Sequence, residues 1–401
     1  MLLVSVFLLA YAIPAIILDC LQMRHIKKAI TQKALLLDTK EYIKAGSYSV
    51  EKLKLNILSK ITESALFAFW ILFGLDFFYN DKLNMLSGYY RDVAFVMLIV
   101  LVGLLVGLPS ALYETFSIDK RYGFCKQTPA LFLLDTLKSS LLGLMIGGGI
   151  VFLLLWVMNN FTLWWIGGFV LLFCFIILAN AIYPTLIAPM FNKFTPLQDT
   201  QLKERIESLM QKVGFQSSGI FVMDASKRDG RLNAYFGGLG NTKRVVLFDT
   251  LLEKISQDGL LAILGHELGH FKHKDIIKNI AIMGVFLFLL FFLASHLPES
   301  FFSQSHLPEQ NACILALVIL LSPIVSFWFM PIIGYFSRKA EYGADAFGAS
   351  LISKSHLANA LVRLVEENKS FPSSHSLYIF FYYSHPPLLE RLKALDYEAL
   401  K

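Results

Sequence analysis

The stretch His266-Glu267-Leu268-Gly269-His270 decides how the rest of the sequence is interpreted. If the residues from Gly259 to Phe271 form an α-helix, the two histidines lie one turn apart on the same face, where both imidazoles can bind one metal ion. Glu267 is then placed to take a proton from a water molecule at that ion. The spacing therefore predicts a Zn²⁺ site on a helix, with Asp258 as its N-cap residue. For these five residues alone, the alternative is a surface helix with a solvated glutamate.

Composition indicates a membrane protein. The 401 residues are 56% hydrophobic and only 16% charged, and this apolar content exceeds that of an ordinary soluble domain. Seven stretches are long and apolar enough to be membrane spans. They are Leu2 to Leu21, Ser64 to Tyr79, Val93 to Leu112, Ser139 to Met158, Leu163 to Met190, Ile276 to Leu297 and Ala312 to Phe336. We therefore expect a mainly α-helical, integral multi-pass protein.

The basic residues predict how these spans are oriented. The first connection carries many lysines and arginines, whereas the fourth and sixth carry none. Because cytoplasmic loops are enriched in Lys and Arg, the N-terminus is expected outside and the polar stretch from about Asn192 to Lys274 in the cytosol. The net charge of +6 follows this topology, so we expect no nucleic-acid partner. We expect a bacterial inner membrane rather than the endoplasmic reticulum.

Few charged residues interrupt the predicted spans. Asp19, Asp76 and Lys278 fall near span ends, which argues against the alternative of a transporter with a structural metal site. The spacing of Gly103 with Gly107, and likewise of glycines 143 and 147, predicts close packing between membrane helices.

A catalytic zinc site needs a third protein ligand. Spans six and seven form a hairpin, so the residues after Phe336 return to the side of the membrane that holds the two histidines. There Glu341 and Asp345 lie one turn apart on a predicted helix. We assign Glu341 as the third ligand and Asp345 as the acceptor of the free N–H of a ligating histidine. Two solvated carboxylates, paired with Arg338 or Lys339, are the alternative.

Three further residues are candidates for the site. His273 is a poor third ligand because it lies about 5 Å further along the helix axis than His270. His385 lies at a proline-marked turn before a final helix. A histidine or arginine brought in from a distant segment can stabilise the oxyanion of an acyl-transfer intermediate, so His385 is a candidate and Arg391 a weaker one. Upstream, residues 202–213 are expected to form a helix, 243–249 a strand and 250–255 a short helix.

In this order, the motifs resemble those of the type I CAAX prenyl endopeptidase family, which are integral-membrane zinc metalloproteases of the gluzincin type. The resemblance spans nearly the whole chain. The matching stretches are Phe124 to Thr128, Pro189 to Leu197, Asn233 to Tyr235, Lys243 to Leu251, His266 to His270, Ser337 to Asp345 and Ser384 to Pro386.

The resemblance implies seven transmembrane helices that enclose a chamber, closed on the cytosolic side by a metalloprotease domain with a small β-sheet. It implies one Zn²⁺ per chain, held by His266, His270 and Glu341, with Glu267 as general base and with His385 and Arg391 assisting the transition state. It also implies that Asn233 and Ala234 bind the substrate backbone. They would do so beside an edge strand, Val245, Val246 and Leu247, that pairs with an extended peptide.

Two departures from the family pattern stand out. Cys125 replaces an asparagine that is usual after the aromatic-Gly-Phe triplet, and residues 227–232 replace a run that usually contains serine and histidine. The loop at which substrates enter therefore differs from that of the family.

We expect four segments: an N-terminal transmembrane region (1–190), a first protease part (191–275), a transmembrane hairpin (276–336) and a second protease part (337–401). The expected function is zinc-dependent endoproteolysis of membrane-associated peptides or proteins, including lipidated ones. Family members remove C-terminal residues after a prenylated cysteine. A quality-control protease without prenyl specificity is the alternative within the same enzyme class.

Overall fold

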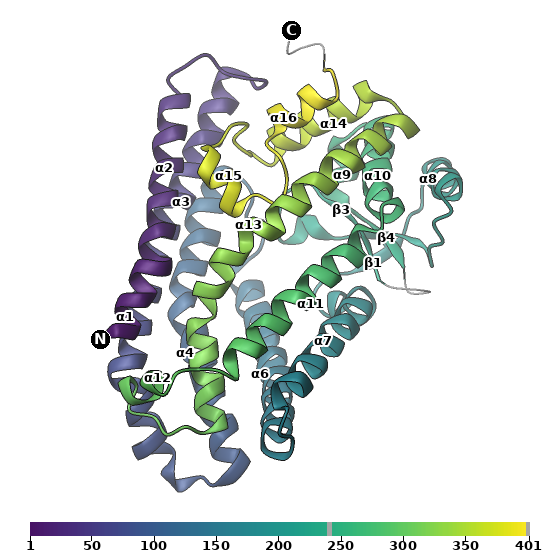
Figure 1. Cartoon of the computed structure of the whole chain (residues 1–401). Coiled ribbons are helices and arrows are strands. Elements are labelled where there is room, and N and C mark those ends of the chain that lie inside the picture. The colour runs from purple at the N-terminus through teal and green to yellow at the C-terminus, as the bar shows by residue number, and fades with distance from the viewer. Residues whose placement is uncertain (239–242, 398–401) are drawn as a thin grey trace.

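Long helices form most of the molecule, and a smaller domain of short helices and strands covers one end of them (Figure 1). The structure is a computed structural model and describes residues 1–238 and 243–397. Within these residues, seven helical segments are long and apolar enough to cross a membrane, as predicted. They run over Leu2–Ala29, Thr39–Gly74, Gly88–Tyr122, Pro129–Asn160, Trp164–Met190, Asp275–Ala294 and Asn311–Leu351.

Several membrane segments contain short 3₁₀ or π turns within or at the end of the helix. The first three segments and the connection between the second and third comprise α1 (Leu2–Phe7), η1 (Leu8–Ala12), α2 (Ile13–Ala29), α3 (Thr39–Phe69), η2 (Trp70–Gly74), η3 (Phe77–Lys82), η4 (Leu83–Met85), α4 (Gly88–Tyr113), η5 (Glu114–Asp119) and α5 (Lys120–Tyr122). The next two comprise α6 (Pro129–Asn160), α7 (Trp164–Ile182), η6 (Tyr183–Ile187) and η7 (Ala188–Met190). Several helices continue past the predicted spans, because polar residues outside the bilayer extend them.

The first and second membrane helices show most clearly how far a helix extends beyond its predicted span. The second helix begins at Thr39, well before the predicted Ser64. In the first segment, α2 continues to Ala29, so Asp19 does not lie near the end of its helix as expected, and it is buried with 1% exposure. The mean hydropathy of a stretch of sequence locates the apolar middle of a membrane helix, but it does not locate the polar ends of that helix.

The membrane helices pack through aromatic and aliphatic side chains. Their largest fully buried members include Trp70, Tyr79 and Phe95. Of the predicted glycine contacts, the one at Gly147 is present, since a Cβ atom built there would lie 3.4 Å from Cε of Met97 on α4. A Cβ atom built on Gly103 or Gly107 would meet no atom within 4 Å, so these glycines do not bring helices together. The same holds for Gly143, and no residue of α6 from 129 to 150 is buried. A chamber enclosed by these helices stays a prediction.

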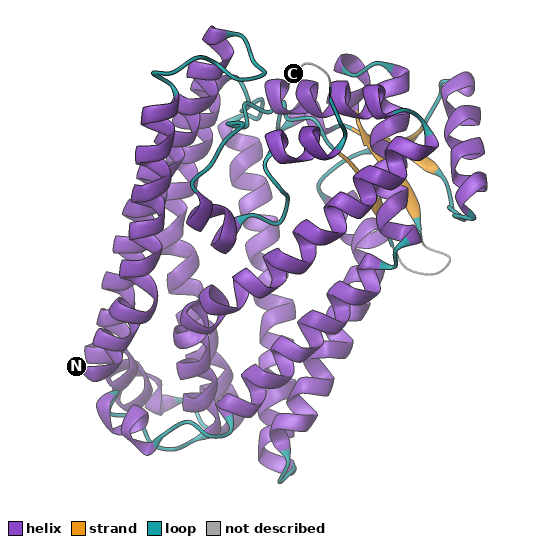
Figure 2. Cartoon of the chain, turned by 45° about the horizontal axis from the view of Figure 1, so that its top comes forward, coloured by secondary structure: helices purple, strands orange, loops and turns teal. Residues whose placement is uncertain are grey.

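A four-stranded mixed sheet lies at the end of the molecule that also holds the C-terminal helices (Figure 2). Its strands are β1 (Phe194–Pro196), β2 (Ile220–Met223), β3 (Ala234–Gly237) and β4 (Arg244–Phe248), in the order β1-β2-β4-β3. β4 pairs with β2 in parallel and with β3 antiparallel.

The position of β4 corrects one prediction. Val245, Val246 and Leu247 are each 0% exposed, and both edges of their strand are already hydrogen-bonded. A strand with two paired edges cannot add a substrate strand. These three residues are therefore not an open substrate-binding edge, and β3 is the edge strand on this side of the sheet.

The histidine-bearing helix lies beside the sheet, within a set of shorter helices. This part of the chain contains α8 (Thr200–Val213), η8 (Ala225–Lys227), α9 (Asp249–Lys254) and α10 (Gln257–Lys272). The predicted N-cap of α10 is wrong by two residues. Ser256 is the N-cap, and its hydroxyl accepts a hydrogen bond from the N–H of Gly259, whereas Asp258 pairs with Arg205 of α8.

The chain then crosses the membrane region twice and returns to α10. The elements are α11 (Asp275–Ala294), α12 (Glu299–Gln304), α13 (Asn311–Leu351), α14 (Lys354–Glu367), α15 (Ser376–Tyr382) and α16 (Leu388–Ala394). α13 is a single helix that continues past residue 336, so the expected segment boundary lies within it. Its C-terminal part packs along α10.

Small residues allow α10 and α13 to approach closely. A Cβ atom built on Gly348 would lie 2.6 Å from the backbone nitrogen of His266, and one built on Gly269 would lie 2.8 Å from Cα of Ala344. Backbone atoms cannot yield as the tip of a flexible side chain can. Glycine is therefore required at both positions for the two helices to cross at this distance.

We expect Gly348→Ala to destabilise the protein, because the added methyl group forces α10 and α13 apart. Overpacking of this kind costs roughly 1–3 kcal/mol, so the melting temperature of the detergent-purified protein should fall. Gly143→Ala is the matched control: it also adds a methyl group to a glycine within a helix, but in open space, and should leave the melting temperature unchanged or slightly higher. Equal shifts for the two variants would contradict this account of the helix contact.

Candidate metal centre and active site

α10 presents three polar side chains toward the end of α13. His266 and His270 are one turn apart, and Glu267 lies between them. His266 is buried with 7% exposure, and the two imidazole rings have centroids 4.9 Å apart. The helix that the spacing predicts is therefore present, and both rings face the same neighbour.

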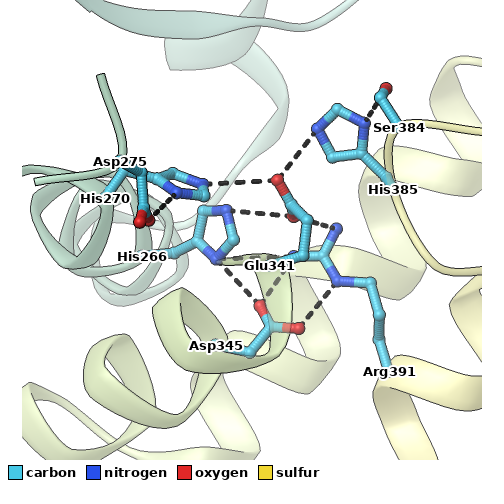
Figure 3. Close-up of polar contacts among 8 residues, drawn as sticks. All are labelled: His266, His270, Asp275, Glu341, Asp345, Ser384, His385 and Arg391. Carbon is cyan, nitrogen blue, oxygen red and sulfur yellow. Dashed lines mark hydrogen bonds and ion pairs between the residues drawn. The ribbon is translucent and has the colours of Figure 1, made fainter. Parts of the chain in front are cut away.

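That neighbour is Glu341 of α13 (Figure 3). Its Oε2 lies 3.5 Å from Nε2 of His266, and its Oε1 lies 3.3 Å from Nε2 of His270. One ligand atom from each of the three residues lies within 4.8 Å of the others. The structure thus brings together the three residues predicted to hold a metal ion.

The chemistry of this group fits a metal ion. Glu341 is 3% exposed, and its Oε2 is buried without a hydrogen-bond partner among the described residues. A buried carboxylate oxygen without a partner is costly, and a bound cation would remove that cost. Two imidazoles and one carboxylate are the ligand set of zinc peptidases that keep one coordination position open.

Each of the two histidines is oriented by its own carboxylate, which contacts Nδ1 of the ring. Nδ1 of His266 lies 2.8 Å from Oδ1 of Asp345, the residue predicted for this contact. Nδ1 of His270 lies 3.0 Å from Oδ2 of Asp275, whose other oxygen accepts a hydrogen bond from Lys278. Such contacts fix the tautomer of each ring and leave Nε2 free to bind a metal ion.

Sequence reasoning missed Asp275. The residue belongs to the next helix, and α10 ends before Lys274, which adopts a left-handed conformation with φ of 57°. This turn reverses the chain and brings Asp275 back beside His270. A positive φ at a lysine leaves no recognisable signal in the sequence, because the residues that favour this conformation are glycine and asparagine.

Arg391 of α16 contacts the site from the C-terminal segment. Its Nε and one terminal nitrogen donate hydrogen bonds of 2.8 and 2.6 Å to the two oxygens of Asp345. The other terminal nitrogen lies 3.6 Å from Oε2 of Glu341. Arg391 therefore holds Asp345 against His266, and the terminal nitrogen that bonds to Asp345 also lies 3.5 Å from Nδ1 of His266.

His385 approaches from the loop before α16. Its Nε2 lies 3.2 Å from Oε1 of Glu341, and its Nδ1 lies 2.8 Å from the hydroxyl of Ser384. The side chain is 61% exposed, so Nε2 remains open to a molecule that enters the site. His273, the competing ligand, packs against Phe347 and is not part of the metal-binding group.

Glu267 faces open space on both sides. It lines one cavity of about 370 Å³ together with Asn233, and a second of about 240 Å³ together with Phe236. Burial raises the pKa of Glu267, and the nearby histidines lower it in part. A carboxylate with a raised pKa is a better proton acceptor near neutral pH than an ordinary glutamate.

The two cavities lie along the edge strand β3. Asn233 and Ala234 line the larger cavity, and Phe236 and Gly237 line the smaller one. The side-chain oxygen of Asn233 accepts a hydrogen bond from the N–H of Ala234, and Asn233 is exposed. The structure therefore places both predicted residues at a cavity that Glu267 also lines, at the start of β3, whose outer edge pairs with no strand among the described residues.

Comparisons with known proteins agree with this geometry. Residues 196–399 match the model of Peptidase family M48, and residues 22–193 match that of the CAAX prenyl protease N-terminal region with five membrane helices. The chain belongs to peptidase family M48. It is thus a membrane metalloendopeptidase, and the predicted enzyme class and fold are confirmed.

Relatives of this M48 peptidase extend along most of its length. CAAX prenyl protease 1 of Saccharomyces cerevisiae is 37% identical over 346 residues, which cover 80% of this chain and 75% of the relative. A human homologue of that protein is 35% identical over 358 residues, covering 76% and 73%. The crystal structure of S. mikatae Ste24p superposes with a TM-score of 0.88 at 34% identity, covering 98% of both chains.

The two departures from the family pattern meet in this M48 peptidase. Cys125 forms a β-bridge with Asp229 of the altered loop. Arg228 of that loop makes a two-pronged ion pair with Asp135 of α6, and Arg231 pairs with Asp119 of η5. The altered loop is therefore tied to membrane helices directly before it leads into β3.

The protonation of His270 makes metal binding depend on pH. Burial lowers the pKa of His270, but the carboxylates of Glu341 and Asp275 raise it by more, to about 9. Below that pH the metal-free peptidase holds a proton that a metal ion must displace. We expect zinc affinity to rise about tenfold per pH unit from pH 6.5 toward 9.

Competition titrations with a zinc chelator across this pH range test the expectation. Calorimetry in buffers of different ionisation enthalpy should show the release of one proton by His270 at pH 7. Asp275→Asn removes one of the groups that raise this pKa, so it should flatten the pH dependence. An affinity that does not change between pH 6.5 and 8 would refute the assignment.

Proposed function

We propose that this peptidase is zinc-dependent and cleaves peptide bonds near the C-terminus of lipidated, membrane-associated substrates. The observation that carries the proposal is the convergence of His266, His270 and Glu341 within 4.8 Å, with Glu267 facing two cavities beside a free strand edge. His266, His270 and Glu341 would hold the ion. When bound, zinc supplies Lewis-acid chemistry, which polarises a carbonyl group and lowers the pKa of water.

Glu267 is the general base of the proposed reaction. Its carboxylate takes a proton from the attacking water and later delivers it to the nitrogen of the leaving amine. Burial suits it to both steps, because a raised pKa lets the carboxylate hold the proton between them. The contact of Asp345 with His266, and that of Asp275 with His270, keep the two rings in the orientation that metal binding requires.

His385 is the donor to the oxygen of the scissile carbonyl as negative charge develops there. Its exposed Nε2 lies on the same side of Glu341 as the cavities that Glu267 lines. Arg391 acts mainly through Asp345, because two of its nitrogens are already engaged. The remaining nitrogen adds positive charge near the reacting carbonyl.

The substrate binds in an extended conformation along β3. Asn233 and Ala234 open into the larger cavity and Gly237 into the smaller one, with Glu267 common to both cavities. A peptide paired with this edge would therefore cross the active site with its scissile bond beside Glu267. The main-chain groups of β3 supply affinity, and the two cavities accept side chains on either side of that bond.

The names of the relatives point to prenylated substrates. Proteins called CAAX prenyl protease 1 match this chain over most of its length. A third cavity, of about 470 Å³, lies between α7 and α11 and shares Phe236 and Gly237 with the smaller active-site cavity. A largely apolar space between membrane helices that adjoins the active-site cavity suits a lipid chain. General cleavage of membrane proteins, without a lipid requirement, is the competing function.

The site faces the cytosol in this proposal. The connection between α2 and α3 lies at the end of the molecule that holds the catalytic domain (Figure 1). This connection and its flanks carry many of the lysines of the chain, and Lys and Arg are enriched on the cytoplasmic side. Location in a bacterial inner membrane stays a prediction.

We expect Glu267→Gln to reduce kcat by at least about a hundredfold, because the amide cannot accept a proton. Bound zinc, measured by mass spectrometry of the purified protein, should remain at one ion per chain. Glu253→Gln is the matched control, since Glu253 is an exposed glutamate of α9 and should keep full activity. Full activity of Glu267→Gln would exclude the proposed base.

Substrate class is tested with one C-terminal peptide in farnesylated and unfarnesylated forms. We expect the farnesylated peptide to have the larger kcat/KM, because the lipid chain adds buried apolar area. Met283→Trp, which narrows the cavity between α7 and α11, should reduce this preference. Equal cleavage of both peptides would favour the competing function.

A further inference from the structure

A buried ion pair joins the first two membrane helices at a distance from the metal ligands. Lys60 of α3 donates a hydrogen bond to Oδ2 of Asp19 on α2. The side chains are 14% and 1% exposed. Charged side chains that are buried away from water are costly even when they are paired, so a buried pair of this kind is a candidate for a functional role. No step of the proposed reaction uses this pair.

The ion pair lies against α15. This short helix packs between α2 and α13 (Figure 1). Nζ of Lys60 lies 5.6 Å from the ring centroid of Tyr382, the last residue of α15, which is the geometry of a cation–π contact. The hydroxyl of Tyr382 and Oδ1 of Asp19 are buried and have no hydrogen-bond partner among the described residues. Lys60 thus contacts Tyr382, whose ring centroid also lies 4.8 Å from that of Tyr378 and 6.4 Å from that of Phe327.

Hydrogen bonds hold the start of α15 to α2 and its end to α13. Before α15, Gln22 of α2 donates to the hydroxyl of Ser374 and accepts from the N–H of His375, at 3.0 and 2.8 Å. After α15, Arg338 of α13 donates to the carbonyl of Tyr383 at 2.6 Å. The position of α15 therefore depends on α2 as well as on α13, and Lys60 of α3 contacts its last residue.

His385 follows α15 by three residues. Its side chain is 61% exposed, so apart from the contacts with Glu341 and Ser384 few atoms restrain the ring itself. The place of its Nε2 beside Glu341 must then follow largely from the backbone at Tyr383 and Ser384. The position of α15 in turn fixes the backbone at these two residues.

We propose that Asp19 and Lys60 are positioning residues for His385. The ion pair holds Tyr382 in place, and Tyr382 fixes the end of α15. The position of α15 then determines where His385 meets the substrate carbonyl. This inference rests on the role proposed above for His385. It adds that the first two membrane helices, which contribute no metal ligand, determine the rate of the chemical step.

The test is a double-mutant cycle on the full chain in detergent, with the farnesylated peptide as substrate. We expect Lys60→Met to lower kcat by between about tenfold and a hundredfold, the cost of a small misplacement of a reacting group. KM and the zinc content should stay unchanged. In a His385→Ala background, Lys60→Met should have no further effect on kcat, because the group that it positions is already absent.

Lys52→Met is the matched control. Lys52 also belongs to α3, pairs with Glu114 at 2.7 Å, and lies 5.6 Å from the ring of Tyr48, but it does not contact α15. Its kcat should stay within about twofold of the wild type. Lys60→Arg, which keeps the charge, should restore most of the activity lost in Lys60→Met.

Lys60→Met leaves Asp19 buried without its partner, and this variant can fail to fold. The double variant Asp19→Asn/Lys60→Met removes both charges and should show the same loss of kcat and the same dependence on His385. If either variant lowers kcat by the same factor in both backgrounds, the ion pair is merely structural and the inference is wrong. If His385→Ala keeps full activity, the proposed role of His385 fails first, and the inference fails with it.

Discussion

The contact between α10 and α13 is the constraint on which the active site depends. Gly348 and Gly269 let the two backbones approach to a distance that any side chain at either position would prevent. At this distance a glutamate of one helix reaches two histidines of the other, and Asp345 reaches the far side of His266. Gly269, the variable position before the second histidine, is thus as necessary to the geometry as the residues that bear the chemistry.

Much of the site could be predicted because its residues lie at fixed spacings on helices. His266, Glu267 and His270 share a helix, as do Glu341 and Asp345, and a membrane hairpin brings the two sets to the same side. The seven membrane helices followed from apolar composition, which is a property of long segments. Helix periodicity and span counting were therefore sufficient to assemble the centre.

The errors arose where the structure depends on pairing between distant segments. The strand at Val245 was predicted correctly, but its neighbours β2 and β3 are separated from it in sequence and are each only four residues long. The sequences of such short strands do not specify their order in the sheet, so the open edge was predicted at β4 instead of β3. The buried pair of Asp19 and Lys60 was missed because each residue alone resembles a charged helix end.

The order of the segments along the chain has a consequence for biosynthesis. The two histidines precede the α11–α13 hairpin, whereas Glu341 is the fifth residue after Phe336, where the predicted span within α13 ends. During translation the histidines are made first, and their third ligand arrives only after the hairpin has crossed the bilayer twice. A nascent chain therefore cannot complete its metal centre before its last two membrane helices are inserted. Proteolytic activity that depends on this centre is therefore acquired only together with the final topology.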